Sequence, residues 1–347
     1  MTRSLQDDRQ EDRQQDRQQD MVVPALLNSD AKVEGTDGIS VCICTLKRPE
    51  LLSRTLVALE NQETGGLFSY SVVVADNDAA ESARQAVADF SAATKLSVTY
   101  CVELRQNIAL ARNKAIENAK GNWIAFIDDD EFPVSNWLLS LYQTCLERQA
   151  DGVLGPVKAH FDTEPPQWAT KGKFFERPTH PTGYKLGWEQ ARTGNVLFRK
   201  NILARLETPF RSEFATAGED MDFFRRAMEQ GCSFVWCDQA VAYEVVPVSR
   251  CTRTYLLKRA LLRGSNFPKH PTDRVRNILK SMIALPCYTV SLPILLFFGQ
   301  HVFLKYLIKT LDHASRLLAF LGVNLATERA DASSRRNAQE PAVRHQA

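Results

Sequence analysis

The stretch WIAFIDDDE, residues 123–131, decides the fold of this chain. Its first five residues are apolar and predict a short buried strand, and Asp128, Asp129, Asp130 and Glu131 follow directly. Four consecutive carboxylates repel one another where a strand leaves a sheet, unless something binds them. A hard cation such as Mg²⁺ or Mn²⁺ removes that repulsion and keeps open positions for a diphosphate. The alternative is a solvated loop, or the cap of a helix over residues 135–149.

Outward from this strand, segments with strand-like and helical periods alternate along the chain. This order predicts an α/β fold with a Rossmann-like, mostly parallel sheet covered by helices on both faces. The second half is less regular, and its long loop over residues 163–184 is typical of a binding or lid element. Strands are predicted over residues 39–45, 70–75, 96–102, 123–127, 152–161, 193–198, 233–236 and 240–246, and helices over residues 50–62, 81–93, 109–119, 135–149 and 218–230.

Polar residues follow three of the predicted strands. Ligands of open α/β sheets bind beyond the carboxyl ends of the strands, so we expect these residues to form a site. They are Thr45 with Lys47 and Arg48, then Asp76 with Asn77 and Asp78, and then the acidic quartet.

Composition sets broad limits on the protein. A chain of 347 residues with 44% hydrophobic content can bury a full core in one large or two modest domains. The net charge of +2 indicates no class of partner. The eight cysteines form no CxxC pair, which favours ordinary packing in a reducing cytosolic compartment. The first twenty residues are polar, so no cleavable signal peptide is predicted.

The two ends of the chain differ from its middle. Residues 1–36 repeat an Asp-Arg-Gln tetrad and predict a disordered tail, and residues 326–347 predict a flexible tail. Between them we expect a sheet domain over residues 37–265 and a basic, apolar, membrane-associating helical region over residues 266–325.

The helical region contains a charge-free apolar run over residues 282–304. As one helix it would reach about 34 Å, enough to cross a bilayer. Pro286, Pro293 and Gly299 weaken that interpretation, and residues 305–323 are amphipathic. A membrane-embedded hairpin is favoured over a single span or a buried soluble helix, and the basic residues before the run place the sheet domain on the cytoplasmic side.

Six short motifs, in this order and spacing, resemble the inverting family 2 glycosyltransferases of GT-A fold, particularly those that build bacterial exopolysaccharide and cell-surface glycans. The resemblance extends over residues 39–264. The motifs are VCICTLKRP (41–49), VVADN (73–77), NIALARN (107–113) with Gly121, IDDDE (127–131), TGN (193–195) and GED (218–220).

The resemblance implies a nucleotide-sugar pocket near the first three motifs. Asp76 accepts a hydrogen bond from the uracil base or, alternatively, caps the following turn. Thr45 and Arg48 line the base and ribose pocket. Asn107 caps a helix whose N-terminus faces phosphate, and Arg112 is either a phosphate ligand or a solvated charge.

The resemblance also assigns the acidic residues. Asp128 and Asp130 occupy the DxD positions, with Asp130 the preferred metal ligand and Asp128 and Asp129 nearer the ribose or in a supporting position. Asp220 is the candidate general base and Glu219 its partner, against the alternative of a helix-capping pair.

Three features leave alternatives or depart from the family pattern. Residues 193–195 form either an acceptor loop or a plain turn. The RCTRTY stretch, residues 250–255, lacks the Gln and Trp of processive members, which favours single-sugar transfer, with Arg253 near the diphosphate. Glu244 stands where some relatives have a metal-binding His, as a ligand or in a salt bridge.

These observations predict a hexosyltransferase that uses a UDP-sugar with Mg²⁺ or Mn²⁺, inverts the anomeric carbon, and acts on a glycan or polyprenyl-linked acceptor in cell-surface polysaccharide synthesis. We expect it at the cytoplasmic face of the bacterial inner membrane, in contact with lipid and without a nucleic-acid partner. The alternatives are a catalytically silent nucleotide-sugar-binding scaffold and a sugar nucleotidyltransferase.

Overall fold

The computed structural model describes residues 37–214, 218–266 and 274–323. The tails predicted over residues 1–36 and 326–347 lie outside these ranges.

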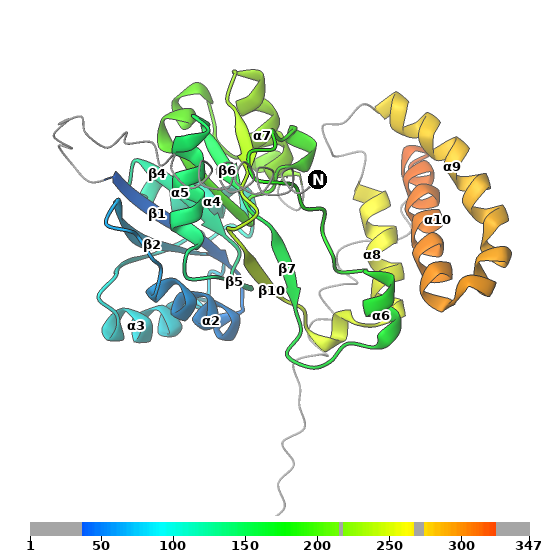
Figure 1. Ribbon diagram of the computed structural model, residues 1–347, viewed down its shortest axis with the longest axis horizontal. Helices are drawn as coiled ribbons and strands as arrows, with labels where there is room; N and C mark the ends of the chain where they lie inside the picture. The colour runs from blue at the N-terminus through cyan, green and yellow to red at the C-terminus, as the bar shows by residue number, and fades with distance from the viewer. Residues whose placement is uncertain (1–36, 215–217, 267–273, 324–347) are drawn as a thin grey trace, which may run out of the picture. The chain divides into compact units, whose positions relative to one another are not determined.

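A seven-stranded sheet forms the centre of the α/β part (Figure 1), in the order β3-β2-β1-β4-β8-β6-β9. All neighbours are parallel except β8, which runs antiparallel to β4 and to β6. The predicted α/β class with a mostly parallel sheet is therefore confirmed. The strands are β1 (Asp37–Thr45), β2 (Phe68–Asp76), β3 (Ser97–Val102), β4 (Trp123–Ile127), β6 (Gly152–Leu154), β8 (Asn195–Arg199) and β9 (Phe234–Trp236).

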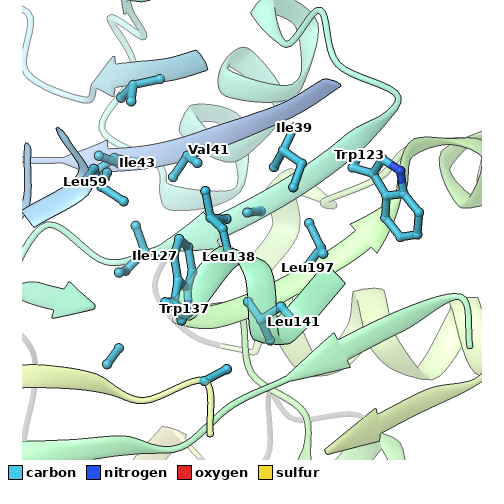
Figure 2. Close-up of a cluster of buried hydrophobic side chains, with 14 of the residues drawn as sticks. Ile39, Val41, Ile43, Leu59, Trp123, Ile127, Trp137, Leu138, Leu141 and Leu197 are labelled. Atoms are coloured by element: carbon cyan, nitrogen blue, oxygen red, sulfur yellow. The ribbon is translucent and has the colours of Figure 1, made fainter. Parts of the chain in front are cut away.

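Helices cover both faces of this sheet, because alternate residues of each strand point to opposite faces. Ile39, Val41 and Ile43 of β1 pack in one buried cluster, which Figure 2 shows with Trp137 and Leu138 of the covering helix. Cys42 packs in the cluster on the other face. The helices are α2 (Pro49–Glu60), α3 (Arg84–Ala93) and α5 (Trp137–Glu147) on the first face, and α4 (Ile108–Asn118) and α7 (Glu219–Glu229) on the second.

A second, three-stranded sheet has the order β5-β10-β7. It corrects one prediction, because residues 152–161 are not a single strand. The chain leaves the central sheet at Gly155, where a Cβ atom would stand 2.2 Å from the carbonyl oxygen of Ala240, and Pro156 cannot donate to a ladder. The three strands are β5 (Glu131–Pro133), β7 (Val157–His160) and β10 (Ala242–Val245).

The remaining elements are short or C-terminal. Helix α8 (Arg253–Asn266) packs on α10 (Gln300–Phe320), and α10 packs on α9 (Arg274–Leu295). Gly264 permits close contact between α8 and α10, since a Cβ atom there would stand 2.5 Å from Cβ of Ser315. The short elements are α6 (Gln167–Gly172), η1 (Trp188–Gln190), η2 (Lys200–Arg205), η3 (Ser212–Phe214), η4 (Val248–Arg250) and η6 (Leu296–Phe298).

The apolar run over residues 282–304 does not form one helix, as a single-helix interpretation would require. It continues α9 into η6, turns at Gly299 with φ of 106°, and enters α10. Glycine adopts this conformation without the steric cost that a side chain would add. Within the described residues, Val275–Phe298 is one helical stretch of 24 residues that is long and apolar enough to cross a membrane.

Candidate active site

The three polar strand ends meet at one edge of the central sheet, as the sequence predicts. Strand β1 lies between β2 and β4, and Thr45 pairs directly with Asp76 at the ends of β1 and β2. The acidic quartet begins immediately after β4. Parallel strands thus bring together residues from three separate motifs.

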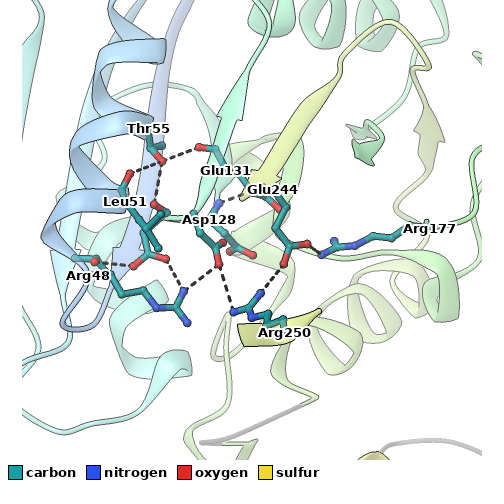
Figure 3. A network of polar contacts seen from close by, with 11 residues as sticks. Arg48, Leu51, Thr55, Asp128, Glu131, Arg177, Glu244 and Arg250 are labelled. Atoms are coloured by element: carbon teal, nitrogen blue, oxygen red, sulfur yellow. Dashed lines mark hydrogen bonds and ion pairs between the residues drawn. The ribbon is translucent and has the colours of Figure 1, made fainter. Parts of the chain in front are cut away.

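One hydroxyl and one guanidinium group at the end of β1 hold the acidic quartet in place. The Thr45 hydroxyl donates to Asp129 Oδ2 at 2.7 Å, and Nη1 of Arg48 donates to Asp129 Oδ1 and Asp130 Oδ2, each at 3.1 Å. Figure 3 shows Arg48 on one side of the acidic residues and Arg250 on the other. Thr45 and Arg48 therefore position Asp129 and Asp130.

Helix α2 fixes the backbone of the same acidic stretch. The buried hydroxyl of Thr55 donates to the carbonyl oxygen of Glu131 at 2.6 Å. Glu131 begins β5, so the quartet leaves the first sheet and enters the second within four residues. This turn between two sheets, rather than a helix cap, sets the direction of the carboxylates.

Asp76 is fully buried and its carboxylate has three protein partners. Oδ1 accepts from the backbone N–H of Asp78 at 3.1 Å, and Oδ2 accepts from the N–H of Ala83 at 2.8 Å and from the Tyr100 hydroxyl at 2.9 Å. These contacts are the ones that the turn-capping alternative predicts. They also order the loop that follows β2.

Asn107 is the N-cap of α4, as predicted. Its side-chain oxygen accepts from the N–H of Ala109 at 3.0 Å, and its backbone N–H donates to the side chain of Asn77 at 2.9 Å. The amide group of Asn107 also donates to the carbonyl oxygen of Ser212 at 2.9 Å. The start of α4 is thus tied to the β2 end and to the segment before α7.

Arg112 is not a solvated charge, because it is buried and forms an ion pair with Glu219. Its guanidinium also lies over the ring of Phe210, 5.5 Å from the centroid. The ion pair joins α4 to the first turn of α7 and so fixes the position of the Glu219-Asp220 pair beside the cavity.

A cavity of about 550 Å³ brings the two acidic motifs together. Asp128 lines it from the end of β4, and Asp220 lines it from the first turn of α7. Arg112 also lines this cavity. Carboxylates from remote parts of the chain therefore face one space that is large enough for a sugar ring.

Asp220 is the more accessible member of the acidic pair on α7. Its side chain is 18% exposed and its Oδ2 lies 3.9 Å from Nε of Arg192. Gly218, at the N-cap of α7, is in a left-handed conformation with φ of 95°. Oδ1 of Asp220 accepts from the backbone N–H of Met221 at 2.7 Å, a contact that the capping-pair alternative predicts, and Asp220 also lines the cavity.

Desolvation and mutual repulsion raise the pKa values of acidic residues at this site. Desolvation by the surrounding protein, together with the charges of Asp130 and Asp129, raises the pKa of Asp128 to about 7 against the opposing effect of Arg112. Burial and the nearby Asp128 also raise the pKa of Glu131. Oε1 of Glu131 and Oε2 of Glu219 are buried without a hydrogen-bond partner among the described residues. A positive ligand would relieve both the crowding and the unsatisfied oxygens.

The oxygen ligands near the quartet are of the kind that a hard divalent cation binds. Asp128 lines the cavity and the unpaired Oε1 of Glu131 lies near its carboxylate, whereas Oδ2 of Asp130 is engaged by Arg48. Mg²⁺ commonly takes one or two protein carboxylates and completes its coordination with water and substrate phosphates. Within residues 37–214, 218–266 and 274–323, no three acidic, His or Cys side chains stand as a group that could hold a metal ion together.

Residues 193–195 form part of the cavity wall. A Cβ atom at Gly194 would stand 2.9 Å from Oε1 of Glu131 and 3.0 Å from Oδ2 of Asp128, so the bare backbone makes room for these carboxylates. The Asn195 side chain is fully engaged, since it accepts from Nε1 of Trp137 at 2.8 Å and donates to Ala240 at 2.8 Å. Asn195 is therefore a structural residue of this wall.

Comparisons with known proteins identify the family. The profile described as Glycosyl transferase family 2 matches residues 40–205. The succinoglycan biosynthesis protein ExoM of Rhizobium meliloti (strain 1021) is 34% identical over 229 residues, which cover 65% of this chain and 72% of that protein. The chain belongs to glycosyl transferase family 2. The predicted family resemblance is thus confirmed, and the protein is a glycosyltransferase.

Other relatives of this glycosyltransferase are more distant. The chondroitin synthase of Escherichia coli is 26% identical over 250 residues, which cover 63% of this chain and 36% of that enzyme. A crystal structure of S. aureus TarS, residues 1–349 in complex with UDP, superposes with a TM-score of 0.48 at 17% identity and covers 83% of this chain and 93% of that one.

Two arginine contacts of the glycosyltransferase site escaped the sequence analysis. Arg177, from the long loop, pairs with Glu244, and Arg250 pairs with Glu244 at 3.1 Å and approaches Asp130 at 3.8 Å (Figure 3). Glu244 of β10 stands directly opposite Glu131 of β5. The salt-bridge alternative for Glu244 is therefore the arrangement observed, and only the pairing of β5 with β10 could have revealed it.

Arg253 points away from the acidic residues. It donates to Oε1 of Gln300 on α10 at 2.6 Å, and its guanidinium lies 5.7 Å from the ring of Trp168. Within the RCTRTY stretch it is Arg250, three residues earlier, that reaches the carboxylates. The expectation that placed Arg253 near a diphosphate does not match this geometry, since α8 turns its side chain toward the C-terminal helices.

Proposed function

We propose that this family 2 glycosyltransferase moves one hexose from a UDP-sugar to a polyprenyl-linked or glycan acceptor, with metal assistance and inversion at the anomeric carbon. The observation that carries this proposal is the shared cavity, which Asp128 lines from the end of β4 and Asp220 lines from the first turn of α7. A direct displacement needs a group that handles the leaving diphosphate on one side and a base on the other.

The quartet side of the cavity suits the donor. Arg48 and Arg250 hold positive charge next to Asp130, at 3.1 Å and 3.8 Å, where a diphosphate would also lie. Asp128 and Asp130 would hold Mg²⁺ or Mn²⁺, which supplies positive charge to the departing diphosphate when bound. Thr45 and the ordered loop at Asp76 border the same edge and support the nucleoside.

The α7 side of the cavity suits the acceptor. Asp220 takes the proton from the acceptor hydroxyl as that oxygen attacks the anomeric carbon from the face opposite the diphosphate. Glu219 is held by Arg112 and keeps the first turn of α7 in place. Because only one base and one displacement take part, the configuration inverts.

The biological setting is inferred from the relatives and the C-terminal helices. ExoM is named as a succinoglycan biosynthesis protein, and another relative as a chondroitin synthase, so we place this protein in cell-surface polysaccharide synthesis. One apolar helical stretch over Val275–Phe298 and the basic residues around it support association with lipid. The corresponding location is the cytoplasmic face of the bacterial inner membrane.

The test measures nucleotide release from a panel of UDP-sugars, with a membrane lipid extract as acceptor source. The parent protein releases UDP with Mn²⁺ or Mg²⁺ and stops when EDTA is added in excess. Asp220→Asn lowers release by about 100- to 10,000-fold. Asp89→Asn retains release, because Asp89 is an exposed acid on α3 that accepts from Gln85 of the same helix. Mass analysis of the lipid fraction identifies the sugar transferred.

The silent-scaffold alternative has its own outcome in this test. If both the parent and Asp220→Asn bind UDP-sugars but release nothing with any lipid extract, the protein is a binding scaffold. Undiminished UDP release by the parent protein in EDTA would contradict the metal requirement and leave the proposed sugar transfer intact. The nucleotidyltransferase alternative is disfavoured, because the chain belongs to a family that transfers sugars.

A further inference from the structure

Helix α9 presents an apolar stripe to the outside of the molecule. Its exposed side chains recur every three or four residues, which places them on one face of the helix. Phe297, in the turn after α9, is 91% exposed, and Val290 and Ile283 are 74% and 70% exposed. The large exposed apolar residues of this stripe are Val275, Leu279, Met282, Ile283, Val290, Ile294, Leu296, Phe297 and Phe298.

The opposite face of α9 makes polar contacts with α10. The Ser281 hydroxyl lies 3.0 Å from Nδ1 of His313, and both residues are buried. The Tyr288 ring contacts Tyr306 and lies 5.7 Å from Nζ of Lys309. This pattern is inverted relative to a helix of a water-soluble protein, since polar groups face inward and large apolar side chains face outward.

The charge around the stripe favours anionic lipid over a second copy of the chain. Between Arg253 and Phe320, Asp312 is the one acidic side chain whose placement the structure describes. A second copy would present the same basic surface and repel the first, whereas anionic headgroups attract it. The basic side chains described in this region are Arg253, Lys258, Arg259, Arg263, Arg276, Lys280, Lys305, Lys309 and Arg316.

The partner helix sets a limit on the depth of insertion. Lys305 of α10 is exposed and lies six residues beyond Gly299, which is about 9 Å along a helix. Asp312, further along α10, pairs with Arg263 of α8 at 2.7 Å. A hairpin that crossed the hydrocarbon core of about 30 Å would carry these charges into it. The stretch free of charged side chains is residues 281–304, which comprise the rest of α9, the turn after it and the start of α10.

We infer that α9 and the turn over Leu296–Phe298 insert into one leaflet of an anionic bilayer without crossing it. In this arrangement α9 lies along the membrane plane with its apolar stripe in the acyl region, and the basic side chains contact headgroup phosphates. The insertion is a property of the C-terminal helices and stands without the proposed reaction.

The same arrangement brings the cavity to the membrane surface. Helix α8 carries Arg259, which lines the cavity, and the Ser315 hydroxyl of α10 donates to the carbonyl oxygen of Leu261 on α8 at 2.7 Å. The packing of α9 on α10 and of α10 on α8 therefore connects the apolar stripe to the wall of the active site. Resting on the proposed function, this geometry presents the cavity to an acceptor whose lipid chain stays in the leaflet.

The experiment measures co-sedimentation of the full chain with vesicles. The parent binds vesicles of equimolar phosphatidylcholine and phosphatidylglycerol more tightly than vesicles of phosphatidylcholine alone. Phe297→Glu weakens binding about tenfold or more, because it removes a large apolar contact and adds a charge that anionic lipid repels. Val57→Glu is the matched control: Val57 is 59% exposed on α2, and its replacement leaves binding unchanged.

Depth is measured with cysteines and a membrane-impermeant maleimide. All eight cysteines lie in the described ranges, and Cys287 on α9 is the exposed one. Cys287 of the parent reacts in solution and is protected on anionic vesicles. Phe298→Cys in a Cys287→Ser background stays unlabelled in sealed vesicles, whether the reagent is outside or trapped in the lumen. Labelling from the lumen would establish a span and overturn one-leaflet insertion.

The remaining outcomes separate this inference from the proposed reaction. If the parent protein consumes UDP-sugar but binds neither kind of vesicle, the insertion is overturned and the proposed reaction stands. If it binds anionic vesicles but consumes no UDP-sugar, the proposed reaction is overturned and the insertion stands. A concentration-dependent dimer that Phe297→Glu dissolves, in a protein that does not bind vesicles, would assign the stripe to a second copy.

Discussion

The active-site cavity and the C-terminal helical pair depart from ordinary burial in opposite ways. Around the cavity, the carboxylates of Asp129, Asp130 and Glu219 are removed from water and are paired with arginine side chains, namely those of Arg48, Arg250 and Arg112. In the helical pair, large apolar side chains such as Phe297 remain exposed. Each arrangement is costly in water and becomes favourable when its ligand binds, a cation and nucleotide sugar in the first case and lipid in the second. Unusual burial therefore locates two different binding surfaces in one chain.

The largest expected effect comes from removing the proposed base in the cavity without disturbing the fold. Asp220→Asn lowers the turnover rate by about 100- to 10,000-fold, because the acceptor hydroxyl loses its base. The side chain is partly exposed, so thermal unfolding of the variant matches that of the parent. Steady-state UDP release and a thermal melt measure the two quantities. A variant that keeps most of its activity would remove Asp220 from the reaction.

The next largest effect comes from breaking the buried ion pair between Arg112 and Glu219. Arg112→Met leaves Glu219 buried without its partner and lowers the free energy of unfolding by about 3–5 kcal/mol. The double variant Arg112→Met with Glu219→Leu recovers much of that loss, because no unpaired charge remains. Chemical denaturation measures both. Equal stability of the single and double variants would show that the pair does not couple.

A smaller effect tests the close approach at Gly194. Gly194→Ala places a methyl group within about 3 Å of Glu131 and Asp128 and destabilises the folded protein by about 1–3 kcal/mol. Gly187→Ala is the control, since the nearest atom there, Oε1 of Gln190, lies 3.6 Å from the added Cβ. Thermal melts compare them. If the two variants melt together, the carboxylates have room to move aside.

The smallest expected effect is that of Ile283→Ser, which compares the apolar stripe of α9 with the buried core. Ile283→Ser on α9 changes the free energy of unfolding in water by less than about 0.5 kcal/mol, because the side chain is 70% exposed. Leu56→Ala on α2 removes a fully buried side chain and costs about 2–5 kcal/mol. Denaturation without lipid measures both values. A large loss in Ile283→Ser would mean that the stripe packs within the protein.

Much of the fold and part of the site could be predicted, because they depend on local patterns. The alternation of apolar strands and amphipathic helices predicts the parallel core, and the polar strand ends predict where Thr45, Asp76 and Asp128 meet. The strand expected over residues 152–161 was wrong as a single unit, because Gly155 and Pro156 pass the chain between two sheets. Periodicity does not show which sheet a strand joins.

The side-chain roles that the sequence analysis missed or left open share one cause. Arg177 lies in a loop without periodicity, and Glu244 becomes meaningful only where β10 pairs with β5 opposite Glu131. Arg112 could not be told from a surface charge until α7 was placed over it. In each case the partner is remote in sequence.

By itself the sequence determined the order of strands and helices, the acidic quartet at a strand end, and an apolar run flanked by basic residues, because side-chain period and charge act locally. Only the tertiary structure decided that Asp128 and Asp220, ninety-two positions apart, line one cavity, and that the apolar run turns back at Gly299. The physical reason is that strand pairing and helix packing join segments through contacts that no local pattern specifies.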